Sequence, residues 1–319
     1  MHLVVGFNGW LGWQYFFSTL FTGLSSGSLY ALIALGYTMV YGVLKLLNFA
    51  HGDVFMIGAY IGYFVLTALG WPLKPILPLA PMLLVAFAAA MLGCALLGVT
   101  IERFAYRPLR NAPRIAPLIS ALGVSFFLQQ TAVLLWSPNP RSYNTFEYKD
   151  AQLFHFVGWG NFRLQYVQLL IMLSTAALMI GLSYFVWRTR TGKAMRAVSV
   201  DPEAASMMGI DVDRVIMVTF LIGSALAGAA GVMTGIVYSQ IDPYMGLGYG
   251  LKAFIAAVVG GIGNIGGAVL GGLLIGLIEA FTGAYVTTAF SDLVVFSVLI
   301  VFLLFRSTGI RGARIVQKV

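Results

Sequence analysis

Long apolar runs separated by short polar connections make up most of the chain. Six of these runs have close to the roughly 20 residues that a helix needs to cross a bilayer. Because a backbone in lipid must satisfy its own hydrogen bonds, runs of this length predict membrane-spanning helices. The six predicted spans are residues 22–44, 48–69, 79–100, 115–136, 166–187 and 215–237. The pattern therefore predicts an all-α, polytopic membrane bundle.

The last apolar region, residues 250–305, does not divide into simple spans. It is too long for two crossings and rather short for three, and glycines interrupt it. Interrupted helices of this kind are typical of re-entrant or broken segments, so we expect one near residues 250–272. The chain is then a single transmembrane domain, 1–319, with about seven to nine helices.

Composition agrees with a membrane protein. Charged residues make up 9 % of the chain and hydrophobic residues 60 %, which leaves too little polar surface to coat a soluble globule. The net charge of +8 would suit nucleic acid if it lay on a polar domain, but the basic residues lie in the connections. The single cysteine, Cys94, lies in an apolar run and predicts neither a disulfide nor a metal site.

The distribution of lysine and arginine predicts the orientation. Basic residues concentrate in alternate connections and in the C-terminal tail, and such surfaces face the cytoplasm. We therefore expect an external N-terminus, a cytoplasmic C-terminus and an odd number of crossings. The predicted external loop is 137–163, and Lys252 is assigned to another external connection. The predicted cytoplasmic residues are Lys45, Arg103, Arg107, Arg110, Arg114, Arg188, Arg190, Lys193, Arg196, Arg214, Arg306, Arg311, Arg314 and Lys318.

A compact polar island, residues 188–214, interrupts the apolar pattern on the predicted cytoplasmic side. Within it, Asp201, Pro202 and Glu203 form a helix-start signature, because aspartate caps free N–H groups and proline suits the first helical position. Gly209 then predicts the end of the helix after about seven residues. A helix this short is not stable by itself, so something must hold it.

The short predicted helix carries small or pliable apolar side chains on the aqueous side. These are Ala204, Ala205, Met207 and Met208. The residues alone leave two interpretations open. In one, the helix inserts into a groove on another protein. In the other, it is a connector that lies on the lipid headgroups.

Several separated stretches resemble one family. Glu203-Ala204-Ala205 followed by Gly209 is similar to the EAA-xxx-G loop of ABC-importer permeases, a cytoplasmic coupling helix that docks on the ATPase subunit. Further blocks occur in family order: LYALIALGYTMVYGVLKLLNFAHGD, IERFAYRPLR, LISALGVSFFLQ, DRVIMVTFLIGSALAGAAGV and KAFIAAVVGGIGNIGGAVLGG. Together they resemble the LivH-like permease subunit of high-affinity branched-chain amino-acid ABC importers. Residues 137–162 carry no family motif.

The resemblance implies a permease subunit of a bacterial inner-membrane importer that binds no ATP itself. It implies as partners a homologous permease, in a homodimer or heterodimer, two cytoplasmic ATPase subunits and an external substrate-binding protein. Branched-chain or related amino acids are the expected substrates, with urea or short amides as the alternative. The coupling residues that it implies are Asp201, Glu203, Ala204, Ala205, Met207, Met208 and Gly209.

The chain carries no sequence motif that indicates an enzyme. HExxH, paired CxxC and the GxxxxGK[ST] phosphate loop are absent, so we expect no catalytic residue, metal or cofactor. The rival function from another class is an ion-coupled secondary transporter. Glu279 and Asp292 are either proton-relay residues of such a transporter or ordinary residues at helix ends. The rival needs no ATPase contact, so it leaves the 188–214 island unexplained.

The stretch NFAHGD places Asn48, His51 and Asp53 at the mouth of a predicted span. At membrane depth such a polar cluster is costly and indicates a functional site, and the family motif implies a gating or pathway role. Just outside the hydrocarbon it is a solvated turn. Both interpretations stay open.

Glycines are dense between residues 260 and 276. Several recur at every fourth position, a spacing that lets another helix approach closely. Alternatively, a broken helix here lines a translocation pathway. The candidate pathway residues are Gly260, Gly261, Gly263 and Asn264. The helix-packing candidates are Gly267 and Gly271, with the same spacing at Gly58 and Gly62 and at Gly231 and Gly235.

Overall fold

The structure is a computed structural model that describes residues 9–71, 79–110, 112–113, 115–143, 156–157, 164–306 and 309–311. Within this part, seven helical stretches are long and apolar enough to cross a membrane. The predicted all-α polytopic bundle is therefore confirmed. Its α-helices are α1 (Gly9–Leu44), α2 (His51–Ala68), α3 (Leu79–Ile101), α4 (Ile115–Trp136), α5 (Tyr166–Arg188), α6 (Arg190–Val200), α7 (Pro202–Met207), α8 (Val212–Tyr238), α9 (Met245–Gly260), α10 (Ile265–Tyr285) and α11 (Ser291–Phe305).

Short elements complete the described chain. A π-helical turn, η1 (Glu102–Tyr106), and a 3-10 turn, η2 (Arg107–Leu109), continue α3, and a second 3-10 turn, η4 (Thr288–Phe290), precedes α11. Two antiparallel ladders consist of two-residue strands. In one, β1 (Arg141–Ser142) pairs with β4 (Gln240–Ile241), and in the other β2 (Phe156–Val157) pairs with β3 (Leu164–Gln165).

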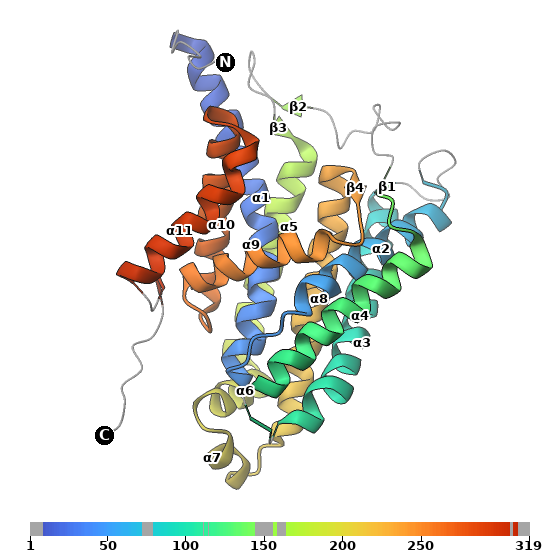
Figure 1. Ribbon diagram of the computed structural model, residues 1–319, viewed down its shortest axis with the longest axis vertical. Helices are drawn as coiled ribbons and strands as arrows, with labels where there is room; N and C mark the ends of the chain where they lie inside the picture. Colours follow the sequence, from blue (N-terminus) through green and yellow to red (C-terminus); the bar gives the residue numbers. More distant parts are fainter. Residues whose placement is uncertain are drawn as a thin grey trace.

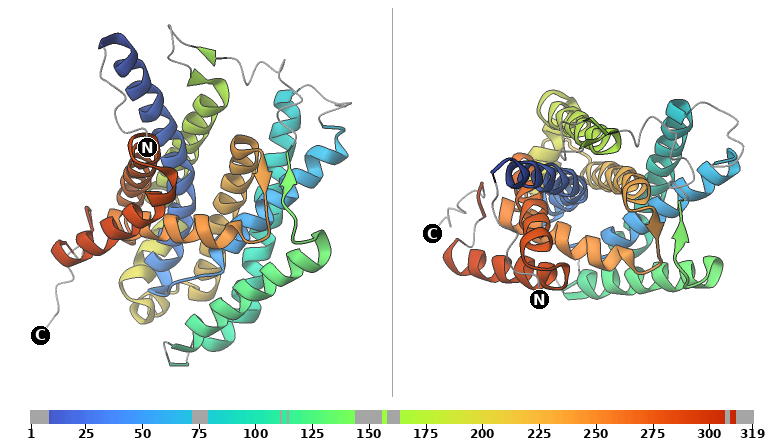
Figure 2. Two further views of the ribbon diagram at one scale, coloured as in Figure 1. Left: turned by 45° about the horizontal axis from the view of Figure 1, so that its top comes forward. Right: turned by 90° about the horizontal axis from the view of Figure 1, so that it is seen from above.

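The helices do not all run in the same direction. In Figure 1, α1, α5 and α8 follow the long axis of the molecule, whereas α9 passes across the front of α1. Figure 2 shows α1, α5 and α8 nearly end-on in its right-hand view. The short helices α6 and α7 lie at the end of the molecule opposite to the N-terminal end of α1 (Figure 1).

The first span begins earlier than its hydropathy predicts. The structure starts α1 at Gly9 rather than at residue 22, because the aromatic segment before the apolar run continues the helix. This segment packs on α10, where the Phe16 and Phe281 ring centroids are 5.3 Å apart and Tyr15 lies edge-on to Tyr285. Tertiary contacts thus extend a helix that composition alone ends sooner.

The predicted interruption between residues 250 and 272 is confirmed as a break between α9 and α10. Gly261 and Gly263 adopt positive φ angles of 105° and 93°, which only glycine takes without strain. Asn264 then caps α10, with its side-chain oxygen accepting from Gly267 N at 2.9 Å. At 16 residues, α9 is about 24 Å long, shorter than a membrane's hydrocarbon core.

Glycines let the central helices approach until their backbones touch. A Cβ on Gly271 would overlap the Ala256 carbonyl of α9, and one on Gly272 would lie 2.6 Å from Ala31 Cα of α1. Gly231 of α8 meets the α2 backbone in the same way, with a Cβ 2.6 Å from Ala59 N. Such contacts gain dispersion and weak hydrogen bonds where lipid supplies no hydrophobic driving force.

Not every one of these glycines serves a helix contact alone. Gly263 lies in the turn between α9 and α10 rather than in a helix. Gly62 lies against both Val232 of α8 and Tyr143, and Gly235 makes room for the Tyr143 ring, which inserts between α2 and α8. The Tyr143 hydroxyl donates to Ala59 O at 2.5 Å, and burial raises the pKa of this phenol, so it remains a donor.

Most of the predicted external loop 137–163 lies outside the described residues, as do Arg114, Arg314 and Lys318. Its described beginning is held by β4, and Trp71 Nε1 donates to Tyr143 O at 2.8 Å. This beginning is therefore anchored to α2 and α8 rather than extended into solvent.

Candidate functional site

The polar island folds into two short helices that the local sequence dictates. Thr189 caps α6, because its hydroxyl accepts from Gly192 N at 3.0 Å. Apolar residues three positions apart, Met195 and Val198, bury one face of α6. Arg196 covers the end of α5, with its guanidinium 4.5 Å from the Trp187 ring centroid. The sequence analysis did not predict α6, although the Thr189 cap and the three-residue spacing of Met195 and Val198 indicate a helix.

The second helix, α7, is capped at both ends as predicted. Asp201 Oδ1 accepts from Glu203 N at 2.9 Å and from Ala204 N at 3.0 Å. At the other end, Gly209 has a φ of +83°. Ile210 N donates to Ala205 O at 3.1 Å and closes a Schellman motif. Both caps stabilise a six-residue helix that has too few internal bonds to persist alone.

The side chains of α7 divide into an inner and an outer set. Ala205 is 5 % exposed and packs into the chain's own core, so it does not share a face with the other apolar residues. Met207 and Met208 are 86 % and 83 % exposed, and Ala204 is exposed as well. The outer surface of α7 is thus a small apolar tip surrounded by the exposed Asp201, Glu203 and Gly209.

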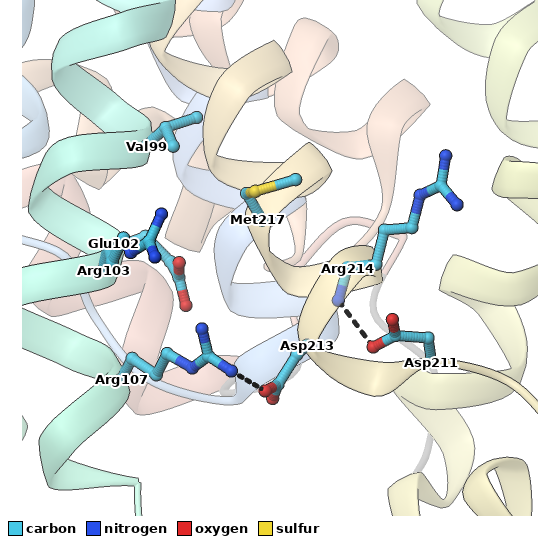
Figure 3. A pocket seen from close by; sticks show the side chains of 8 residues that line it. All are labelled: Val99, Glu102, Arg103, Arg107, Asp211, Asp213, Arg214 and Met217. Atoms are coloured by element: carbon cyan, nitrogen blue, oxygen red, sulfur yellow. Dashed lines mark hydrogen bonds and ion pairs between the residues drawn. The ribbon is translucent and has the colours of Figure 1, made fainter.

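A charged network joins the exit of α7 to the end of α3. Arg110 forms ion pairs with both the buried Glu102 and with Asp213, in the first turn of α8. Arg107 reaches the same carboxylate, with Nη2 2.5 Å from Asp213 Oδ2. Figure 3 shows Arg107 and Asp213 meeting across the mouth of a pocket between α3 and α8.

The pocket beside this network has a volume of about 290 Å³. Arginine and carboxylate side chains line it together with Val99 and Met217, and Arg214 points away from the Arg107 and Asp213 pair (Figure 3). The sequence interpretation assigned these arginines only to a cytoplasmic surface. The motif IERFAYRPLR held the missed signal, because Glu102 and Arg110 are only 8 positions apart and Pro108 between them disfavours a continuing α-helix.

The NFAHGD residues are buried at the start of α2, so the interpretation as a solvated turn is wrong. Asn48, His51 and Asp53 are each at most 3 % exposed. Asp53 Oδ1 accepts from Gln129 Nε2 of α4 at 2.9 Å, and its other oxygen accepts from Ser125. These bonds offset the cost of placing a carboxylate inside the bundle.

Asn48 connects this cluster to the charged network. Its Oδ1 accepts from the Tyr106 hydroxyl at 2.9 Å, and Tyr106 ends the π-turn that begins at Glu102. The His51 ring packs edge-on against Tyr37, with centroids 4.7 Å apart. A continuous set of contacts therefore leads from the α7 exit to the start of α2.

Comparison with known proteins identifies the family. Residues 19–303 match the family described as "Branched-chain amino acid transport system / permease component". The chain belongs to this family. A high-affinity branched-chain amino acid transport system permease protein of Pseudomonas aeruginosa, BraD, is 44 % identical over 96 % of this chain and 98 % of its own length.

Two further members cover much of the chain. The Escherichia coli K12 permease protein LivH is 42 % identical over 96 % of this chain and 98 % of its own length. A probable LivH of Methanocaldococcus jannaschii is 28 % identical over 82 % and 80 %. The resemblance read from the sequence blocks is thus confirmed, and the chain is a membrane permease component rather than an enzyme.

Within this permease, the candidate pathway residues form the turn between α9 and α10. Gly260 ends α9, Gly261 and Gly263 turn the chain, and Asn264 caps α10. Gly267 lies against Gly260, so a candidate packing residue and a candidate pathway residue are in contact. Their part in translocation stays a prediction.

One constellation contradicts the sequence interpretation. Lys252 does not lie in an external connection but in the middle of α9. Its Nζ is 2.7 Å from Glu279 Oε1 and 2.8 Å from Asp292 Oδ1, so Lys252 forms an ion pair with each of these carboxylates. Lys252 and Glu279 are 27 positions apart along the chain, and Glu279 and Asp292 are 13 apart. No local sequence pattern predicts that the three are in contact.

Proposed function

We propose that this chain is the transmembrane permease subunit of an ATP-driven importer for branched-chain or related amino acids in the bacterial inner membrane. Its similarity over nearly full length to permeases of such transport systems supports the substrate class. A homologous permease, two cytoplasmic ATPase subunits and an external binding protein complete the transporter. The chain itself binds no ATP.

The exposed tip of α7 is the observation that carries the ATPase contact. Methionines that are more than four-fifths exposed on a capped helix have no partner surface within the described chain. Flexible, polarizable side chains of this kind suit a groove on another protein. The coupling residues are Asp201, Glu203, Ala204, Met207, Met208 and Gly209, with Ala205 anchoring the helix from within.

Coupling then follows from the rigidity of α7 and its connections. Closure of the ATPase subunits pushes α7, whose two caps keep it from unfolding. The displacement enters α8 directly and reaches η1 through Arg110, which holds Asp213 and Glu102 together. From η1 it reaches Asn48 and the start of α2 through Tyr106.

Reconstitution tests this function. The chain is co-expressed with its partner permease and ATPase subunits, placed in proteoliposomes with internal or external ATP, and supplied with leucine-loaded binding protein. We expect radiolabelled leucine to accumulate only when ATP is on the ATPase side. Uptake of urea but not leucine would favour the amide alternative. ATP-independent uptake that a protonophore abolishes would favour the ion-coupled transporter.

The proposed orientation has an external N-terminus and a cytoplasmic C-terminus. Cysteine at exposed Asn139 should react with an impermeant thiol reagent on intact cells, and cysteine at exposed Arg190 should react only after permeabilisation. Cys94 is replaced by alanine in both variants. The reverse labelling pattern would overturn the orientation.

A further inference from the structure

Four helices bring an ion cluster together inside the bundle. Lys252 of α9 lies between Glu279 of α10 and Asp292 of α11. Tyr30 of α1 donates its hydroxyl to the second Glu279 oxygen at 2.5 Å. Glu279 lies six residues before the end of α10, about 9 Å along its axis. Ionisable groups at such positions are costly and mark substrate or ion pathways.

The cluster is open on one side. The side chains of Lys252 and Asp292 are 17 % and 67 % exposed in the single chain. A charged group on that side cannot face hydrocarbon without a large desolvation cost. Polar irregularities at membrane depth persist where protein or a water-filled cavity covers them. The open side therefore faces an aqueous path or a polar partner surface rather than lipid.

An aromatic wall stands beside the charges. Tyr249, one turn before Lys252 on α9, has its ring centroid 5.7 Å from Tyr238 and 5.5 Å from Phe55. Tyr30 lies 6.2 Å from the same ring. Residues three apart share a helix face, so the wall and the ammonium group of Lys252 are neighbours. A charged head beside an apolar wall matches a small amphipathic solute.

We propose that Lys252, Glu279 and Asp292 bind the zwitterionic head of an α-amino acid during its passage through the membrane. Lys252 donates to the substrate carboxylate, and Glu279 and Asp292 accept from its ammonium group. The aliphatic side chain lies against Tyr249. A zwitterion adds no net charge to the site, so its entry exchanges one set of ion pairs for another. This inference rests on the proposed function and names the part of the chain that contacts its substrate.

The test uses the complete transporter in proteoliposomes with two readouts. Leucine uptake reports passage, and ATP hydrolysis stimulated by leucine-loaded binding protein reports docking and coupling. In Lys252→Met we expect uptake to fall about tenfold or more, the loss expected for one charge-assisted contact, while stimulated hydrolysis persists. Lys252→Arg, which keeps the cation, should retain uptake. Lys45→Met, which removes an exposed lysine at the end of α1, should match the parent.

Each outcome separates this inference from a structural role. Parental uptake by Lys252→Met would overturn it, and so would equal loss of uptake and hydrolysis in an assembled complex. If Lys252→Met does not assemble, Lys252→Met combined with Glu279→Gln removes the half-buried carboxylate that the first change leaves without its cation, and the same two results apply to it. A parent complex that does not transport leucine contradicts the proposed function as well. An active parent with an equally active variant contradicts only the inference.

Discussion

Apolar groups are exposed to solvent at the tip of α7 but closely packed at the interface between α1 and α10. On α7, Met207 and Met208 lie almost fully in solvent. Between α1 and α10, Gly272 and Gly276 approach Ala31 and Gly27 so closely that no Cβ fits. Within the described residues, the chain covers its own surface between α1 and α10 but leaves the apolar tip of α7 uncovered.

This difference separates a surface that the chain covers itself from one that stays uncovered within the described residues, as the proposed ATPase contact requires. The glycine contacts need no further protein, because each backbone already has a neighbour. The α7 tip is stabilised by its caps yet leaves its apolar surface uncovered. The charged network around Arg110 is a third region, which joins the first turn of α8, directly after α7, to the end of α3. Substitutions in the three places should therefore have different consequences.

The largest effect is expected from filling the glycine interface. In Gly272→Leu the side chain would overlap the Ala31 backbone of α1, so α1 and α10 must separate. We expect little folded chain in the membrane, measured by size-exclusion chromatography of a fluorescent fusion. Gly181→Leu on α5 is the matched control, because no atom lies within 4 Å of a Cβ there. Equal yields of both variants would show that the close glycine contact does not matter for folding.

A smaller effect is expected in the charged network around Arg110. Arg110→Met leaves the buried Glu102 without its ion-pair partner, and breaking a buried pair costs about 3–5 kcal/mol. Arg107→Met breaks a half-exposed pair and should cost less than about 1 kcal/mol. Thermal unfolding of the purified complex measures both. Similar melting temperatures for the two variants would show that burial does not distinguish these pairs.

A similarly small effect is expected at the opposite end of the molecule from α7. Tyr143→Phe keeps the ring in its glycine-lined notch and removes only the hydrogen bond to Ala59 O. The expected cost is about 1 kcal/mol, typical of one neutral hydrogen bond. The same melting experiment measures it. A loss as large as that of Arg110→Met would mean that the hydroxyl has a role beyond this bond.

Sequence periodicity and local signals predicted the features that depend on neighbours in the chain. Five of the six predicted spans correspond to long apolar helices of the described chain, whereas 48–69 corresponds to α2, which is not among them. The α7 caps follow from Asp201 and Gly209. The break between α9 and α10 follows from glycines at 261 and 263. Each of these signals operates within a few residues.

The features that sequence did not predict join distant segments. Lys252 meets Glu279 and Asp292 only after α9 crosses the bundle, and apolar composition hides its position within a helix. Asp53 is buried because Ser125 and Gln129 of α4 reach it. Ala205 differs from Met207 because α7 packs on its own chain. No hydropathy pattern records which side of a six-residue helix turns inward.

The central claim is that the α7 tip is held by an ATPase subunit, and retention of that subunit tests it most directly. The co-expressed complex is captured through a tag on this chain, and the bound ATPase is quantified for Met207→Arg and for Asn139→Arg. Arginine at position 207 would place an unpaired charge in an apolar groove, at a cost of several kcal/mol. Asn139 is exposed near β1, far from α7 in Figure 1, and controls for the added charge. We predict that Met207→Arg loses the ATPase while Asn139→Arg keeps it. Full retention by Met207→Arg would contradict the account.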